Sequence, residues 1–168
     1  VAAAPRLLTR RINGLSNRGA TPLWMQERLR RAGLRSINPV VDVTNYVLLE
    51  CGQPMHAYDA HRVHGPLTVR LARVGEKLTL LDERSIELAG DEVLITDDNG
   101  PIGLAGVMGG QGTSITEEVT DVLLEVAWFA PEAIAGRARR LGLQTDASQR
   151  FERGVDPQLQ AGAMVRAT

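Results

Sequence analysis

The side chain with the clearest chemical potential in this sequence is a carboxylate in an apolar segment. Glu125 lies inside the run DVLLEVAWF. Because a strand alternates its side chains between two faces, Glu125 should share a face with Leu123 and Ala127. A carboxylate buried there without a partner costs several kcal/mol. Glu125 is therefore a solvent-facing strand residue, one end of a structural ion pair, or a fixed acceptor for a ligand hydroxyl or amine.

A glycine-rich segment, GVMGGQGT at positions 106–113, follows an apolar strand. It lacks the Gly-Lys-Ser/Thr ending of a P-loop and the GxGxxG spacing of a dinucleotide site. Gly109 and Gly110 would allow backbone N–H and C=O groups to approach a ligand closely. A plain tight turn is the other interpretation.

His56 follows Pro54 and Met55, just after a predicted helix end, and is expected on a loop. It is either a hydrogen-bonded loop histidine or a group that acts on a substrate. With Cys51 and the two later histidines it matches no common metal-ligand spacing, so no metal site is predicted.

The segment 136–157, GRARRLGLQTDASQRFERGVDP, holds more polar chemistry than a packing helix needs. It places the turn Thr145–Ser148 between two arginine-rich parts. No GxSxG motif is present, and Thr145 and Ser148 have no neighbouring base in the sequence, so a nucleophilic triad is not predicted.

Composition limits the class of protein. The chain has 168 residues, of which 43% are hydrophobic and 23% charged, which fits one domain over positions 1–168. No apolar run approaches the ~20 residues of a membrane span, so no membrane partner is predicted. The single Cys51 fits a reducing compartment, and a cytoplasmic location is expected.

The net charge of −1 argues against a protein that binds nucleic acid through a large basic surplus. The positive charge is almost all arginine and is clustered around positions 28–35 and 137–153. Such clusters either contact phosphates locally or lie on solvated helix faces and pair with Glu27, Glu132 and Glu152.

The sequence predicts helices at both ends of the chain and strands in its middle. Helices are predicted from a Thr21 cap to Gly33 and, after Asn38, over 39–51. Strands are predicted in the runs 67–72, 77–81, 85–88, 92–96, 101–108 and 121–129, with hairpin turns at 82–84 and 97–100. One helix should run from Pro131 to Gly142, another from a capping box of Asp146 and Gln149 to Gly154. A last helix starts at Asp156 and meets the chain end at Thr168 without a stop signal, which favours a piece of a longer polypeptide.

Three blocks of this sequence, 21–59, 122–129 and 136–157, together resemble the B3/B4 region of the β subunit of bacterial phenylalanyl-tRNA synthetase. The resemblance covers nearly the whole chain. It implies an α+β fold with layered β-sheets packed with helices. It also implies an editing activity in protein biosynthesis, the hydrolysis of tyrosine wrongly attached to tRNA(Phe), with aminoacylation carried out by the α subunit.

The resemblance also assigns roles to residues. Glu125 would accept a hydrogen bond from the hydroxyl of the tyrosine, with the Gly109 backbone beside the ring. His56 would lie near the scissile ester, where it positions the tRNA end or a water. Thr145 and Ala147 would line the pocket. Because none of these is an obvious nucleophile, the resemblance favours direct attack of water on the ester.

The expected partners are tRNA(Phe) carrying tyrosine, the α subunit and the rest of the β subunit. No cofactor is expected in this domain, and the intact ligase would use ATP and magnesium elsewhere. Two other functions remain: a non-catalytic module that binds tRNA or the partner subunit, and a free-standing editing factor. The unfinished last helix weighs against a free-standing factor.

Overall fold

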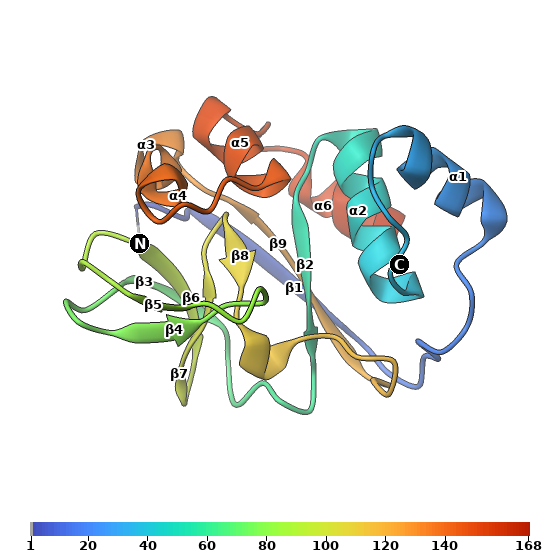
Figure 1. The fold of residues 1–168 in the computed structure, drawn as a ribbon, viewed down its shortest axis with the longest axis horizontal. Helices are drawn as coiled ribbons and strands as arrows, with labels where there is room; N and C mark the ends of the chain where they lie inside the picture. The colour runs from blue at the N-terminus through green and yellow to red at the C-terminus, as the bar shows by residue number, and fades with distance from the viewer. Residues whose placement is uncertain (1) are drawn as a thin grey trace.

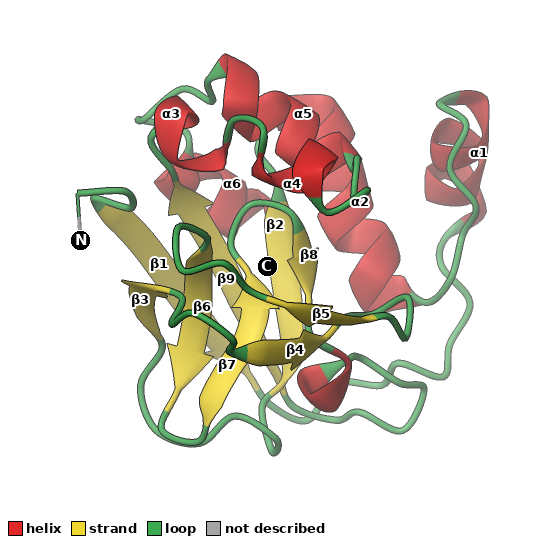
Figure 2. Cartoon of the chain, turned by 60° about the vertical axis from the view of Figure 1, so that its left-hand side comes forward, coloured by secondary structure: helices red, strands yellow, loops and turns green. Residues whose placement is uncertain are grey.

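Three antiparallel sheets form the strand framework of the computed structural model, which describes residues 2–168. A three-stranded sheet has the order β1 (Arg6–Ile12), β9 (Val122–Trp128), β2 (Met55–Asp59). A four-stranded sheet has the order β3 (Thr68–Leu71), β6 (Val93–Asp97), β7 (Gly100–Leu104), β8 (Met108–Gly109). The hairpin of β4 (Lys77–Thr79) and β5 (Ser85–Glu87) crosses in front of the four-stranded sheet (Figure 2).

The helices lie in two groups (Figure 1). The first group lies beyond the three-stranded sheet and consists of α1 (Leu23–Arg31), α2 (Pro39–Cys51) and α6 (Gln160–Ala167). Of these helices, α2 and α6 pack on the sheet. The short helices α3 (Pro131–Ile134), α4 (Arg137–Arg140) and α5 (Asp146–Arg153) cover one end of the strand framework. A 3-10 turn, η1, spans Gln111–Thr113. The predicted α+β class, with sheets and helices in layers, is confirmed.

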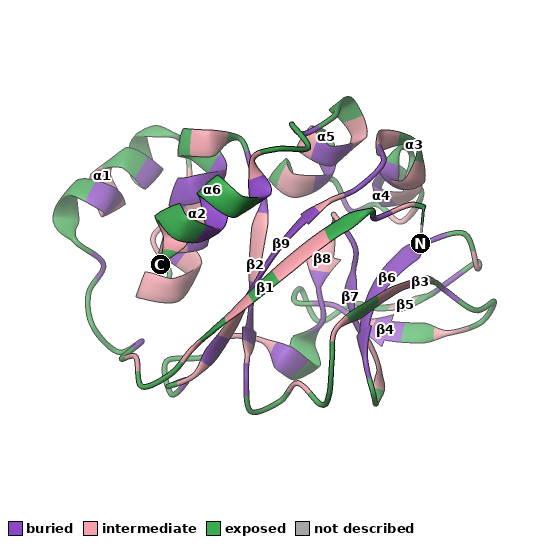
Figure 3. Cartoon of the chain, turned by 180° about the vertical axis from the view of Figure 1, so that it is seen from behind, coloured by how far each residue is buried: buried purple, intermediate pink, exposed green. Residues whose placement is uncertain are grey.

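Strand β9 separates two hydrophobic cores, which explains its almost continuous apolar sequence. Leu124 and Val126 pack with Val47 of α2 and Met164 of α6. On the opposite face, Ala127 belongs to the larger core between the two main sheets. Figure 3 shows β9 buried along most of its length, beside the more exposed β1. Since side chains alternate along a strand, Glu125 faces the larger core with Ala127.

The predicted strands and turns of the middle region are present with shifts of one or two residues at their ends, except that the run 101–108 divides into β7 and β8 around a turn. Helix α2 also matches its prediction: the Asn38 side chain accepts from the backbone N–H of Val41, and Gly52 ends the helix with φ of 73°. A left-handed residue at this position is the usual role of a C-terminal glycine.

Two strands were not predicted. Strand β1 occupies a region for which no element was proposed, and β2 contains His56, so the prediction that His56 lies on a loop is wrong. Both strands owe their conformation to pairing with β9, more than 60 residues away from β2 along the chain. Local sequence patterns do not carry that information.

The helix ends differ from the prediction in four places. Thr21 does not cap α1; its hydroxyl donates instead to the buried carboxylate of Asp42, 2.5 Å away. The helix expected from Pro131 to Gly142 is two short helices, because Gly136 takes a φ of 79° between them. The capping box of α5 is formed by Thr145 and Ser148 rather than by Asp146 and Gln149. The last helix begins at Gln160, after a turn, rather than at Asp156.

Candidate functional site

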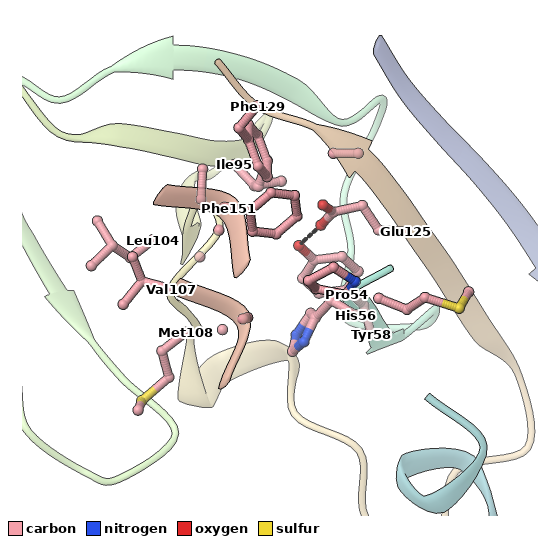
Figure 4. Close-up of a pocket in the computed structure, with 17 residues that line it drawn as sticks. Pro54, His56, Tyr58, Ile95, Leu104, Val107, Met108, Glu125, Phe129 and Phe151 are labelled. Atoms are coloured by element: carbon pink, nitrogen blue, oxygen red, sulfur yellow. Dashed lines mark hydrogen bonds between the residues drawn. The ribbon is translucent and has the colours of Figure 1, made fainter. Parts of the chain in front are cut away.

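A cavity lies between the two main sheets and α5 (Figure 4). It has about 450 Å3 of empty space, part of it open to solvent. Its walls come from β2, β9, the segment 103–109 and the α5 residues Ala147 and Phe151. Most lining groups are apolar or glycine; the polar side chains are those of His56, Tyr58 and Glu125. A mostly apolar cavity with a few convergent polar groups is the usual form of a small-molecule site.

Glu125 is buried in the wall of this cavity, with 6% of its surface exposed. Its Oε2 accepts a hydrogen bond from the hydroxyl of Tyr58 (Figure 4). Burial raises the pKa of Glu125 to about 7, and the bond from Tyr58 opposes that rise. Within residues 2–168 no ion pair or other hydrogen bond involves this carboxyl. The solvent-facing strand position and the structural ion pair are therefore both excluded, and a carboxyl oxygen remains available on the cavity side.

His56 lies directly opposite Glu125 in the antiparallel pairing of β2 with β9. Its ring meets the ring of Tyr58 edge to face, with centroids 4.5 Å apart. Burial lowers the pKa of His56 to about 4, so the imidazole is neutral at pH 7. Its Nε2 is enclosed and has no hydrogen-bond partner within the part of the chain that the structure describes. A neutral histidine with a free ring nitrogen can donate to or accept from a ligand or a water.

Gly109 gives the imidazole its room. A Cβ added at this position would lie 2.4 Å from both Cε1 and Nε2 of His56. Gly109 is part of β8 and pairs with Gly103 of β7. The tight turn considered for this segment is present just before it, at 105–107, where Gly106 has a φ of 68°. The close approach that Gly109 allows is therefore to the imidazole of His56.

Ala147 lines the cavity, whereas Thr145 does not. The Thr145 hydroxyl donates to the carbonyl of Val107 (2.9 Å) and accepts from the backbone N–H of Ser148 (3.1 Å). It therefore caps α5 and ties that helix to the segment 103–109. The structure thus brings together four of the five predicted site residues, His56, Gly109, Glu125 and Ala147, and gives Thr145 a supporting position.

Sequence reasoning missed Tyr58, the partner of Glu125. The signal was the spacing of His56 and Tyr58, which share a face if the segment is a strand. It also missed Gln53, which is fully buried just before β2. The amide of Gln53 donates to the carbonyl of Ala127 (3.0 Å), and its side-chain oxygen accepts from Gln160 (2.9 Å). These bonds fix the start of β2 against β9 and α6, and so hold His56 in place.

In the arginine cluster at positions 137–153, some side chains form ion pairs and others do not. Arg140 bonds Asp91 and the buried Glu92, each at 2.5 Å, and Arg150 bonds Asp146 at 3.0 Å. Within residues 2–168, the side chains of Arg139 and Arg153 are exposed and form no ion pair or hydrogen bond. In the first cluster, Glu27 pairs with Arg30 and Arg31 as expected. The pairing expected for Glu132 and Glu152 is wrong, because Asp91, Glu92 and Asp146 take that role.

Across positions 2–168 no three His, Cys, Asp or Glu side chains lie close enough together to hold a metal ion. None of the helices formed there has the length and apolar character that crossing a bilayer requires.

The cavity, with a buried carboxyl and a histidine in its wall, belongs to a domain of a known family. The model of the B3/4 domain matches residues 3–168, and the chain belongs to that family.

Proteins similar to this chain include phenylalanine–tRNA ligase β subunits. The chain is 55% identical over 166 residues to that subunit of Pasteurella multocida (strain Pm70) and 56% identical over 167 residues to that of Vibrio parahaemolyticus. Each match covers 99% of this chain and 21% of the relative, so the chain spans about a fifth of their length.

Among the solved structures that share the fold is an N-terminal fragment of the phenylalanyl-tRNA synthetase β subunit from Pyrococcus horikoshii, with a TM-score of 0.55. The match covers 79% of this chain and 42% of that one at 14% sequence identity. The resemblance seen in the sequence to the B3/B4 region of the bacterial β subunit is confirmed.

Proposed function

We propose that this domain edits: it hydrolyses tyrosine from mischarged Tyr-tRNA(Phe), within a phenylalanine–tRNA ligase. The observation that carries the proposal is the buried carboxyl of Glu125, which presents an oxygen to an apolar cavity next to the neutral imidazole of His56. The family and the 55% identity to β subunits support the assignment to this enzyme.

Discrimination follows from the cost of an unpaired buried group. The phenol of a bound tyrosine donates a hydrogen bond to Glu125, whereas phenylalanine leaves the carboxyl without that bond. A site built around such a bond rejects the analogue that lacks the hydroxyl, because its buried polar group is then left unpaired. The apolar lining, with Phe129 and Phe151, suits the aromatic ring of the ligand.

Ester cleavage in this proposal uses water as the nucleophile. No serine, threonine or cysteine is among the residues that line the cavity. The oxygen of a water attacks the carbonyl carbon of the ester, and the bond from that carbon to the ribose oxygen breaks. The ribose oxygen takes up a proton from the water and leaves as the hydroxyl of tRNA(Phe), and free tyrosine is released. His56 holds the tRNA end or the attacking water through its free ring nitrogen. Gly109 keeps that ring in position, and Ala147 leaves room for the aminoacyl group. The reaction needs no cofactor in this domain.

The partners follow from the same proposal. They are tRNA(Phe), the α subunit and the remainder of the β subunit, in cytoplasmic protein synthesis. The exposed Arg139 and Arg153 are suited to phosphate contacts. These arginines also favour the second candidate, a module that binds tRNA without chemistry.

Hydrolysis of Tyr-tRNA(Phe) by the whole synthetase tests the proposal and separates the two candidates. Free tyrosine is followed over time for the wild type and for Glu125→Ala, with Phe-tRNA(Phe) as the matched substrate. We expect Glu125→Ala to slow tyrosine release and to reduce the preference for tyrosine by about 10- to 100-fold, the usual value of a hydrogen bond to a charged group. A binding module would leave the ester intact in both proteins. Unchanged preference in Glu125→Ala would rule out the hydroxyl-reading role.

A further inference from the structure

Among residues 2–168, Tyr58 is the one residue that makes a hydrogen bond to the carboxyl of Glu125. Its side chain is 1% exposed, and its hydroxyl donates to Oε2 of Glu125. The same hydroxyl lies beside β7, at 3.7 Å from the position of a Cβ on Gly103. The ring also meets the imidazole of His56 edge to face, with centroids 4.5 Å apart. The phenol is therefore enclosed by protein groups before any ligand enters.

The carboxyl of a glutamate is not fixed by its own covalent geometry. Its last torsion joins a tetrahedral to a planar carbon and is broad, so the two oxygens turn easily. The bond from Tyr58 selects one orientation, with Oε2 occupied. A carboxylate accepts at about four lone-pair positions, so a second phenol can bind at Oε1 while Tyr58 keeps its bond.

We propose that Tyr58 is a positioning residue that sets the tyrosine specificity of the site, by holding the Glu125 carboxyl with one oxygen directed to the ligand. This inference rests on the proposed editing function and names how its discriminating group is held. In this arrangement Glu125 accepts from two phenols, one from the protein and one from the substrate.

Charge supports the same role. The bond from Tyr58 lowers the pKa of Glu125, against the larger effect of burial. No other titratable group that lines the cavity lowers the pKa of Glu125 in place of Tyr58. Among the lining residues the only further one is His56, which is neutral. The residue of β1 opposite Glu125 is Thr9. The charged side chains of the neighbouring elements have other partners or face solvent. On α5, Asp146 pairs with Arg150 and Arg153 is exposed. On the flanking strands, Arg11 pairs with Asp121 and Asp59 with Arg62, while Arg6 and Arg10 donate to Pro157 and Thr168.

The experiment compares Tyr58→Phe with wild type in the whole synthetase. This change removes a single oxygen and keeps the ring, so the fold and the ring contact with His56 remain. We expect the preference for Tyr-tRNA(Phe) over Phe-tRNA(Phe) to fall about tenfold. The pH at which that preference is half developed should also move upward, because Glu125 loses the bond that favours its ionised form. A purely structural role would not move that midpoint.

Tyr46→Phe is the matched control. Tyr46 is also buried and its hydroxyl also donates to a carboxylate, that of Glu50 at 2.9 Å, but it lies on α2 in a separate core cluster. Its loss should change neither the preference nor the pH midpoint. The double variant gives a second readout. When Glu125→Ala is already present, Tyr58→Phe should cause no further loss of preference, because Tyr58 affects the preference only by holding the carboxyl of Glu125.

The two proposals fail in different ways. If Tyr58→Phe keeps both the wild-type preference and the wild-type pH midpoint, or if its loss simply adds to that of Glu125→Ala, the positioning role is overturned while the editing function stands. If Glu125→Ala itself keeps the preference for tyrosine, the reading of the hydroxyl by Glu125 is wrong, and the role of Tyr58 falls with it.

Discussion

His56 and Glu125 are direct partners in the register of β2 and β9, on one wall of the cavity. They do not form an ion pair. Burial acts on them in opposite directions, lowering the pKa of His56 to about 4 and raising that of Glu125 to about 7. In both cases the uncharged form is favoured, because an apolar wall disfavours charge. The site therefore meets a ligand with a neutral imidazole and with a carboxyl that ionises near neutral pH.

These two pKa shifts predict opposing effects of pH on stability. The folded-state pKa of Glu125, about 7, lies above the ordinary 4.5, so its stabilising contribution is full below about 4.5 and is lost as pH rises through about 7. The folded-state pKa of His56, about 4, lies below the ordinary 6.5, so its contribution is full above about 6.5 and is lost as pH falls through about 4. Between pH about 4.5 and 6.5 the two effects oppose each other.

Denaturant unfolding of the domain across this pH range checks the prediction. Relative to Glu125→Gln, the wild type should lose up to about 3 kcal/mol of unfolding free energy as pH rises from about 4.5 to 7. Relative to His56→Gln, it should gain a similar amount from about pH 4 to 6.5. Curves that stay parallel to the wild type in both variants would show that neither group has a shifted pKa in the folded state.

The contact of Gly109 with His56 makes a second prediction. In Gly109→Ala the new methyl would overlap the imidazole, at 2.4 Å from two of its atoms, so the ring must move. Displacing a positioned group by about 1 Å can cost 10²-fold in rate; we expect a loss of tyrosine release of about that size. Overpacking should cost about 1–3 kcal/mol of stability. Gly112→Ala is the control, since nothing lies within 4 Å of its added Cβ. Equal activity of the two variants would mean that the position of His56 does not matter.

The sequence predicted the elements whose signals are local. The ends of α2 follow from Asn38 and Gly52, and β9 from its apolar run. It also identified Glu125, because a carboxylate in such a run is out of place. It did not predict β1, whose residues are half exposed and include three arginines, so no alternation is visible. The capping box of α5 was placed one residue late because Thr145 and Asp146 are both good caps, and the bond from Thr145 to Val107 decides between them.

The pairing of Tyr58 with Glu125 shows why the rest of the site was out of reach. The two residues are 67 positions apart, and they meet only because β2 pairs with β9. The segment 55–59 has no strand signal strong enough to reveal that pairing, since it is short and follows a proline. A site assembled across a sheet depends on register, and register is a property of the whole fold.

A third prediction concerns the ion pair that anchors α4. Glu92 is 1% exposed and bonds Arg140 at 2.5 Å, with further bonds from the backbone N–H groups of Ala89 and Gly90. Arg140→Met leaves a buried carboxylate without its charged partner. We expect the unfolding free energy, measured by denaturant titration, to fall, because the carboxylate of Glu92 stays buried without its charged partner.

Arg139→Met provides the control for that variant. Arg139 is exposed, is next in sequence and forms no ion pair within residues 2–168, so its loss should cost about 0.5 kcal/mol or less. The double change Arg140→Met with Glu92→Leu should recover most of the loss, because an apolar pair can replace a buried ion pair. If the single and double variants are equally unstable, the uncompensated charge is not the cause.

The last prediction fills the cavity from its helical side. Ala147 lies in the first turn of α5, is half-buried and lines the cavity together with Phe151. In Ala147→Trp the indole would occupy the space that the proposed function gives to the aminoacyl group. Tyrosine release from Tyr-tRNA(Phe) should therefore be abolished, while the domain still unfolds cooperatively with a loss of stability of at most about 3 kcal/mol. The matched variant Ala161→Trp places the same side chain on the exposed face of α6 and should leave hydrolysis unchanged.

The rates of the two variants are compared by following free tyrosine, and their folding is compared by circular dichroism and denaturant titration. Wild-type hydrolysis in a folded Ala147→Trp domain would mean that the substrate binds elsewhere, since an indole and an aminoacyl group cannot share this space.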